Sequence, residues 1–201
     1  MTMRVAVAAS GQGSNLEALL RVLGPGAPAR VVLVLSDRPG AGALGRGREH
    51  GVATEILPDP HAPSAWLRAL ETHRIDLLVL AGYLKLVPAE VVARYRGRIL
   101  NIHPSLLPEF GGRGMYGRRV HAAVLASGAR ESGASVHLVK ERYDRGPVLA
   151  RARVPVLPDD TPDRLAARVL EVEHRLLPAV VLAAAAAGRP VPLPEPVESA
   201  S

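Results

Sequence analysis

The sequence contains no cysteine, which excludes disulfides and thiolate metal ligands and is typical of a protein of a reducing compartment. We therefore expect a cytoplasmic protein. Long apolar runs are also missing, since the alanine-rich stretch at 182–187 is too short to span a bilayer. The chain does not open with a basic segment followed by an apolar one, so we expect neither a signal peptide nor a membrane anchor.

Aromatic residues are scarce, at 3% of the chain. The arginines behind the net charge of +6 are scattered along the sequence, and a nucleic-acid-binding surface would need basic residues interleaved with aromatic ones. We therefore expect no nucleic-acid partner. The surplus charge predicts a solvated, arginine-rich surface, part of which attracts anionic small molecules.

The 201 residues, with 48% hydrophobic and 22% charged residues, are enough for one domain with a substantial core. Short apolar segments alternate with segments of helical periodicity, which predicts a parallel sheet with right-handed crossovers. The expected strands of this parallel part cover residues 4–9, 31–36, 53–57, 75–81 and 99–102.

The last third of the chain departs from this alternation. Residues 134–140 and 147–156 predict an antiparallel hairpin, and 162–187 predicts a long final helix that Pro178 kinks or splits. The sequence thus predicts a single-domain, three-layer αβα fold over residues 1–187, with a twisted, mostly parallel, Rossmann-like sheet and an antiparallel addition. Residues 188–201 are rich in proline and predict a flexible tail.

A glycine-rich turn follows the first strand and reads Ser10-Gly11-Gln12-Gly13-Ser14-Asn15. The helix after it is expected to start with Ser14 or Asn15 as its N-cap, leaving free backbone N–H groups that suit a phosphate. The turn has neither the G-x-G-x-x-G spacing of a dinucleotide site nor the lysine of a P-loop. It therefore predicts a site for a single phosphate, although a purely structural turn is an equal alternative.

Two polar side chains, Asn101 and His103, interrupt the apolar run that starts at Ile99. Residues two apart on a strand share a face, and Pro104 ends the strand directly afterwards. Ligands of parallel sheets bind beyond the carboxyl ends of the strands, where an amide donor beside an imidazole suits attack on a carbonyl-type carbon. A turn-capping Asn101 and a core His103 are the alternative, and the residues alone leave both open.

Four segments together resemble a known family. The turn at 10–15 is followed by Leu80-Ala81-Gly82-Tyr83-Leu84-Lys85, by Asn101-Ile102-His103-Pro104-Ser105-Leu106-Leu107-Pro108, and by Ser135-Val136-His137 with Asp144-Arg145-Gly146-Pro147. Over residues 3–187 the chain resembles the phosphoribosylglycinamide formyltransferases, of the folate-dependent formyltransferase superfamily. The run from Asn101 to Pro108 with a downstream aspartate is specific to that superfamily.

The resemblance implies a reaction of purine biosynthesis. The amine of glycinamide ribonucleotide takes the formyl group of the co-substrate 10-formyltetrahydrofolate, giving formylglycinamide ribonucleotide and tetrahydrofolate without a metal. Another folate-dependent formyltransferase, acting on methionyl-tRNA or an amino sugar, and a formyltetrahydrofolate deformylase are the related alternatives. A phosphate-binding module without catalysis is the alternative from another class, and monomer and homodimer are both open.

The resemblance also implies roles for three catalytic residues. Asn101 donates to the oxygen of the reacting carbon, and His103 adds a second donor and positive charge. Asp144 holds that charge, which is expected to raise the pKa of His103 above its ordinary value, and relays protons. Without the resemblance, the residues around Asp144 favour a turn aspartate.

Binding residues are implied as well. Gly13, Ser14 and Asn15 match the positions that hold the substrate phosphate, and Glu173 matches the acid that binds the ribose hydroxyls, against the alternative of an exposed helix charge. The expected folate contacts are Leu84, Lys85, Leu86, Val87, Asn101, Val139, Lys140 and Glu141, of which Leu84, Leu86 and Val87 read equally as core.

Two departures from the family pattern stand out. The loop at 109–117 is longer than in many members, and the arginine that many members carry before the helix at 64–73 is absent. We expect Lys85 or Arg68 to meet the glutamate end of the folate instead.

Overall fold

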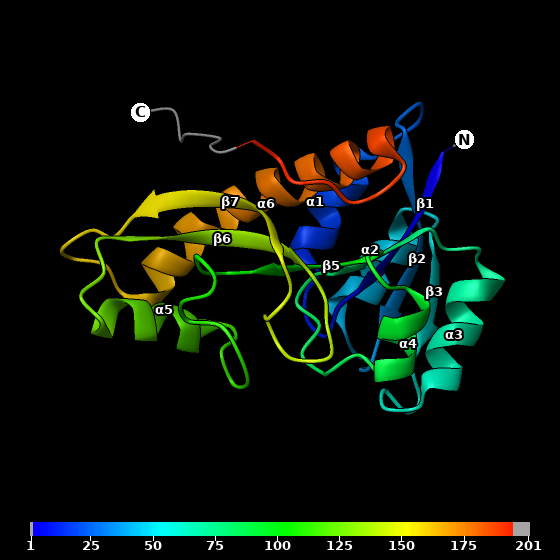
Figure 1. Ribbon diagram of the computed structural model, residues 1–201, viewed down its shortest axis with the longest axis horizontal. Helices are drawn as coiled ribbons and strands as arrows, with labels where there is room; N and C mark the ends of the chain where they lie inside the picture. The colour runs from blue at the N-terminus through cyan, green and yellow to red at the C-terminus, as the bar shows by residue number, and fades with distance from the viewer. Residues whose placement is uncertain (1, 195–201) are drawn as a thin grey trace.

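The computed structural model describes residues 2–194. Its centre is one seven-stranded sheet in the order β3-β2-β1-β4-β5-β6-β7 (Figure 1). Strands β1 to β5 pair in parallel, and β6 and β7 add an antiparallel edge. The strands are β1 (Met3–Ala8), β2 (Ala29–Ser36), β3 (Ala53–Ile56), β4 (Leu77–Leu80), β5 (Ile99–His103), β6 (Glu131–Leu138) and β7 (Val148–Pro155).

Helices cover both faces of this sheet, so the three-layer architecture and the mixed sheet are confirmed. In Figure 1, α1 and α6 lie along one face, and α3 and α4 lie on the other. The helices are α1 (Ser14–Val22), α2 (Gly42–Glu49), α3 (Pro63–Thr72), α4 (Ala89–Arg94), α5 (Arg118–Ala126) and α6 (Pro162–Ala187).

The alternation of side chains along β1 divides the core in two. Val5 and Val7 face the larger cluster, which contains residues of α1, α2, α5 and α6, whereas Ala6 and Ala8 face the cluster around Trp66 of α3. All four residues of β1 named here are fully buried. A central parallel strand that is covered on both faces needs such an unbroken apolar run.

Two local expectations are wrong. Helix α1 begins at Ser14, but its N-cap is Gly13 in a left-handed conformation (φ 76°) and no side chain caps it. The Asn15 side chain is directed across the molecule to another partner, described below. Helix α6 runs from Pro162 to Ala187 with Pro178 inside it, so a split at Pro178 is wrong, whereas a kink there stays a prediction. The helix continues because the apolar residues around Pro178 are buried in the larger core and their packing outweighs one lost backbone hydrogen bond.

The first residues after α6 follow the edge of the sheet. The N–H of Leu193 donates to the carbonyl of Leu149 on β7 at 2.9 Å, and the Leu193 side chain packs against the larger core. Residues 195–201 of the expected tail lie outside the described residues, so its flexibility stays a prediction. Of the helices between residues 2 and 194, none has the apolar length to cross a bilayer.

Candidate active site

A cavity of about 850 Å³ opens at the carboxyl ends of the central strands. It lies where the strand order reverses, with β1 between β2 and β4, the place at which open α/β sheets bind ligands. Its volume is within the range of small-molecule sites. Side chains from distant parts of the chain share its wall, among them Asn15, Asn101, His103, Asp144 and Glu173.

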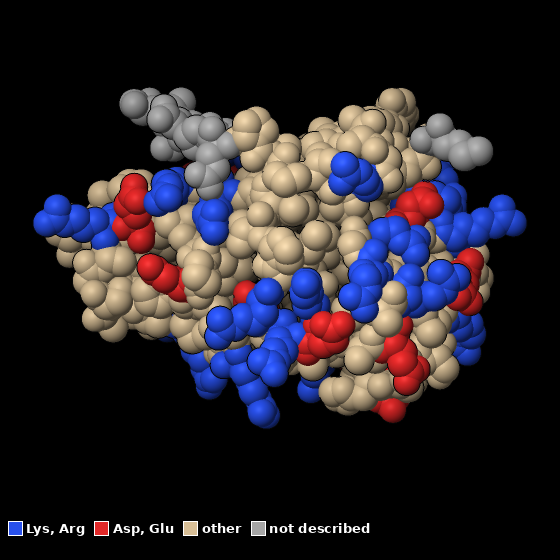
Figure 2. Space-filling model, viewed as in Figure 1, with Lys and Arg blue, Asp and Glu red and all other residues tan. Residues whose placement is uncertain are grey.

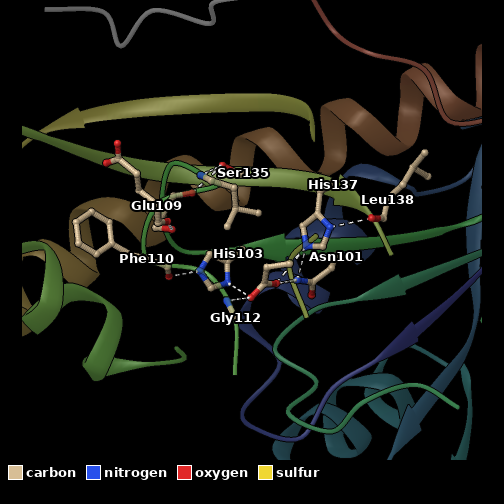
Figure 3. A network of polar contacts seen from close by, with 11 residues as sticks. Asn101, His103, Glu109, Phe110, Gly112, Ser135, His137 and Leu138 are labelled. Atoms are coloured by element: carbon tan, nitrogen blue, oxygen red, sulfur yellow. Dashed lines mark hydrogen bonds and ion pairs between the residues drawn. The ribbon is translucent and has the colours of Figure 1, made fainter. Parts of the chain in front are cut away.

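Asn101 is held from the neighbouring antiparallel strand. It lies opposite His137 in the β5–β6 register, and its Nδ2 atom is 3.0 Å from His137 Nε2 and 3.3 Å from Asp144 Oδ1. The other ring nitrogen of His137, Nδ1, lies 2.9 Å from the carbonyl oxygen of Leu138 (Figure 3). His137 Nε2 also lies 3.3 Å from Asp144 Oδ1. With its hydrogen on Nδ1, shared with the Leu138 carbonyl, the ring accepts from the Asn101 amide through Nε2, and with a hydrogen on Nε2 it donates to Asp144.

His103 lies between two acceptors. Its Nε2 is 2.9 Å from the carbonyl oxygen of Phe110 (Figure 3), and its Nδ1 is 3.6 Å from Asp144 Oδ2. Burial lowers the pKa of His103, and the opposing effects of Asp144 and the Phe110 carbonyl offset this only in part. The expectation of a raised pKa is therefore wrong for the free protein, because desolvation of the imidazolium outweighs the nearby carboxylate.

Asp144 occupies the turn between β6 and β7 in a left-handed conformation (φ 52°), which aspartate tolerates better than most residues. Two residues on, a Cβ at Gly146 would overlap the carbonyl of Leu138, so the turn requires glycine there. The N–H of Gly112 donates to Asp144 Oδ2 at 2.8 Å. Burial alone would raise the pKa of Asp144, but the contact with His137, the charge of His103 and the Gly112 N–H together lower it, which favours the ionised carboxylate.

The first turn of the chain meets the last helix in the cavity wall. Gly13 packs so closely that a Cβ there would lie 2.8 Å from the Cα of Ala43. Asn15 Nδ2 donates to Glu173 Oε2 at 2.7 Å. Glu173 is buried rather than an exposed helix charge, and burial raises its pKa to about 7 although the Asn15 hydrogen bond lowers it.

Some of the expected folate contacts line the cavity and others do not. Leu84, Lys85 and Leu86 line the cavity, as do Val139 and Lys140. In contrast, Val87 is buried in the cluster around Trp66, and Glu141 lies outside the cavity lining, as do Gly13 and Ser14 beside Asn15. For Val87, the core alternative is the one that the structure supports.

The long loop at 109–117 forms much of the cavity wall through residues 112–117. Its backbone supplies the Phe110 carbonyl and the Gly112 N–H that contact His103 and Asp144. Cationic side chains surround the cavity: Lys85, Arg113, Arg118, Arg119, Lys140 and Arg142 line it, whereas Arg68 does not. Figure 2 shows Lys and Arg gathered on the lower middle of the visible face.

The lining residues for which the sequence predicts no role include Tyr83, His121 and His137. His137 could have been found by pairing the two predicted strands around Asn101, but for His121 the sequence holds no signal. Among residues 2–194, no group of three or more His, Asp and Glu side chains is arranged to hold a metal ion.

Comparisons with known proteins identify the family of the chain. The formyl transferase family matches residues 3–181. The chain is 43% identical over 186 residues to a protein of Arabidopsis thaliana named phosphoribosylglycinamide formyltransferase, chloroplastic, covering 89% of this chain but only 64% of that one. It is 36% identical to the phosphoribosylglycinamide formyltransferase of Escherichia coli strain K12, covering 89% of this chain and 85% of the other.

Solved structures give the same relationship. The crystal structure of phosphoribosylglycinamide formyltransferase from Brucella melitensis matches with a TM-score of 0.84 at 44% identity, covering 92% of this chain and 97% of that one. Sequence and fold agree, and the chain belongs to the formyl transferase family, among the phosphoribosylglycinamide formyltransferases.

Proposed function

We propose that the chain transfers the formyl group of 10-formyltetrahydrofolate to the amine of glycinamide ribonucleotide. The observation that carries this proposal is the convergence, in one cavity, of Asn101, His103 and Asp144 with the Asn15–Glu173 pair. A phosphate-binding module would have no use for a buried Asp–His pair beside an amide donor. The relatives named for this activity support the same assignment.

The ribonucleotide is expected on the side of α1 and α6. The backbone N–H groups at the start of α1, with the partial positive charge of the helix end, suit its phosphate. Glu173 is positioned to accept from the ribose hydroxyls, and binding hydroxyl donors there would favour its ionised form. Asn15 Oδ1 is buried without a hydrogen-bond partner among residues 2–194, which leaves it free to accept from the ligand.

The folate, which supplies the formyl group, is expected against Leu84, Leu86 and Val139, three apolar side chains of the cavity wall. Flat ring systems bind to such apolar surfaces. Lys85 is exposed at the same wall and suits the carboxylates of the glutamate end. Of the two cations expected to take this role, Lys85 therefore fits and Arg68 does not.

Asn101 is the donor for the formyl oxygen as negative charge develops there. Its bond to Asp144 is longer than its bond to His137 (3.3 against 3.0 Å), so the Asp144 bond is the one that the substrate oxygen would replace. One such donor is typically worth about 100- to 1000-fold in rate. His137 keeps the amide oriented during this exchange.

Asp144 and His103 are proposed to handle the proton. A carbon–nitrogen bond forms to the ribonucleotide amine and another breaks to the folate, so the amine loses one proton and the folate nitrogen gains one. The Asp144 carboxylate, ionised in the free protein, can accept the first through water. It also stabilises His103 whenever that ring is protonated.

The test is an assay with glycinamide ribonucleotide and 10-formyltetrahydrofolate, following tetrahydrofolate and the formylated ribonucleotide. We expect both products, and neither when the ribonucleotide is omitted. Tetrahydrofolate without the ribonucleotide would identify a deformylase, and turnover only with methionyl-tRNA or an amino sugar would identify a sister transferase. Binding of the ribonucleotide without any turnover would leave a binding module. Size-exclusion chromatography of the same sample separates the monomer from the homodimer.

A further inference from the structure

Three buried polar atoms in the cavity wall have no hydrogen-bond partner among residues 2–194. They are Asn15 Oδ1, Tyr83 Oη and His121 Nδ1. Buried polar atoms are almost always hydrogen-bonded, because leaving one unpaired costs free energy. Unpaired atoms in the wall of a ligand cavity therefore indicate where a ligand completes the bonding.

His121 differs from the other buried imidazoles of this wall. Both ring nitrogens of His103 face protein acceptors, and both ring nitrogens of His137 have protein partners. His121 is only 4% exposed, and within the described part of the chain its ring makes no hydrogen bond to the protein. Its imidazole is therefore the one that is available to a substrate.

The position of His121 connects the two halves of the proposed site. It lies on α5, which packs against α6, the helix that carries Glu173. His121 and His103 both line the cavity. Burial lowers the pKa of His121, and the positive charge of a protonated His103 lowers it further. His121 is thus a neutral ring near the reaction centre, on the helix beside the proposed ribose site.

The chemistry of the ribonucleotide leaves one group for this position. The α1 loop suits its phosphate, Glu173 suits its ribose hydroxyls, and Asn101, His103 and Asp144 surround its amine. The remaining polar group is the amide that joins the ribose to the aminomethyl carbon. A neutral imidazole offers one donor and one acceptor, and an amide needs the same two partners.

We propose that His121 is a binding residue for the ribonucleotide, whose imidazole hydrogen-bonds the substrate amide and so aims the adjacent amine at the formyl carbon. This inference rests on the proposed function. It assigns a contact to a buried ring nitrogen that has no hydrogen-bond partner among residues 2–194.

The test compares two substitutions by calorimetry, with glycinamide ribonucleotide titrated into the protein without folate. His121→Phe keeps a planar ring but removes both nitrogens, and we expect it to raise the Kd about tenfold, the effect of one hydrogen bond. His121→Asn places an amide near the position of Nδ1, and we expect it to recover most of the affinity. The Kd for a non-reactive folate analogue should stay unchanged in both variants.

His174→Phe is the matched control. His174 also has a buried, unpartnered ring nitrogen, but it lies outside the cavity lining, so its substitution should leave the ribonucleotide Kd unchanged. Thermal unfolding of each variant checks that it is folded. If His121→Phe does not fold, His121→Gln takes its place, because its longer side chain puts the amide near the position of Nε2 rather than of the unpartnered Nδ1. We then expect a raised ribonucleotide Kd in His121→Gln but not in His121→Asn, and wild-type affinity in both would overturn the inference.

An unchanged ribonucleotide Kd in His121→Phe would overturn the inference. Equal losses for the ribonucleotide and the folate analogue would also overturn it, because they would indicate a distorted cavity rather than a lost contact. If the wild-type protein neither binds nor formylates the ribonucleotide, the proposed function itself fails, and this result is distinguishable from both others.

Discussion

Asn101 on β5 and His137 on β6 face each other across an antiparallel pair, with Asn101 Nδ2 3.0 Å from His137 Nε2. The proposed oxyanion donor is thus oriented by the neighbouring strand rather than by residues next to it in sequence. The carbonyl of Leu138 fixes the ring in turn. His137 is on this basis a positioning residue whose removal should affect turnover more than binding.

His137→Phe tests that role. It keeps an aromatic ring but leaves the Asn101 amide without its nearest acceptor, so we expect kcat to fall about tenfold with little change in either KM. Steady-state kinetics with both substrates measures this. A rise in KM at constant kcat would instead mean that His137 shapes a binding surface, and wild-type values for both would remove it from the mechanism.

Asp144→Asn removes the charge beside His103 while keeping the size of the side chain. Because an amide can neither accept the amine proton nor stabilise a protonated His103, we expect kcat to fall by at least about 100-fold. The ribonucleotide Kd from calorimetry should remain near the wild-type value. Asp160→Asn is the control, since Asp160 pairs with Arg168 outside the cavity lining and should cost stability without lowering kcat. Near-normal turnover in Asp144→Asn would exclude Asp144 as the proton acceptor.

Glu173 makes the stability of the free protein depend on pH. Its pKa is raised from 4.5 to about 7 by burial. The contribution of Glu173 to the free energy of unfolding is therefore fully present below pH 4.5, where the side chain is protonated, and is lost as the pH rises through 7. Glu173→Gln removes that loss. Relative to wild type, we expect its free energy of unfolding to gain about 3 kcal/mol between pH 4.5 and 8.5, since one pKa unit is about 1.4 kcal/mol.

Urea denaturation of both proteins at the two pH values measures this difference. Effects of His103, His121 and His174, whose pKa values are lowered, are common to both proteins and cancel. A difference that does not change with pH would show that Glu173 is ionised throughout the range.

Ser14→Asp places a negative charge in the first turn of α1. If the substrate phosphate binds there, charge repulsion should raise the Kd of the ribonucleotide about tenfold or more, as measured by calorimetry. Ser64→Asp makes the same change in the first turn of α3, where Ser64 is exposed, and should have no effect on binding. Equal affinities for the two variants would place the phosphate elsewhere.

The architecture could be predicted from the sequence because its signals are local. Apolar runs such as Ile99–Leu100 and the residues after them identify strands and their ends, and the spacing of Asn101 and His103 fixes a shared face. Asp144, in contrast, was recognisable only through the resemblance to a family, because its contacts with His103 and Gly112 join residues far apart in sequence.

The errors have the same origin. The pKa direction of His103 depends on how deeply tertiary packing buries the ring, and the N-cap of α1 depends on Asn15 having a distant partner. Three expectations stay predictions: the folate contact of Glu141, the flexibility of the tail and the cytoplasmic location.

The hydrogen bond from Asn15 to Glu173 joins residues 158 positions apart. A ribosome therefore completes the strand that carries Asn101 and His103, and the turn that carries Asp144, before it delivers the acid of the proposed ribose site. A nascent chain that stops short of α6 would possess the reactive groups and the turn before α1 without the acid proposed to hold the ribose. Truncated chains are therefore expected to bind the ribonucleotide more weakly than the full-length chain does.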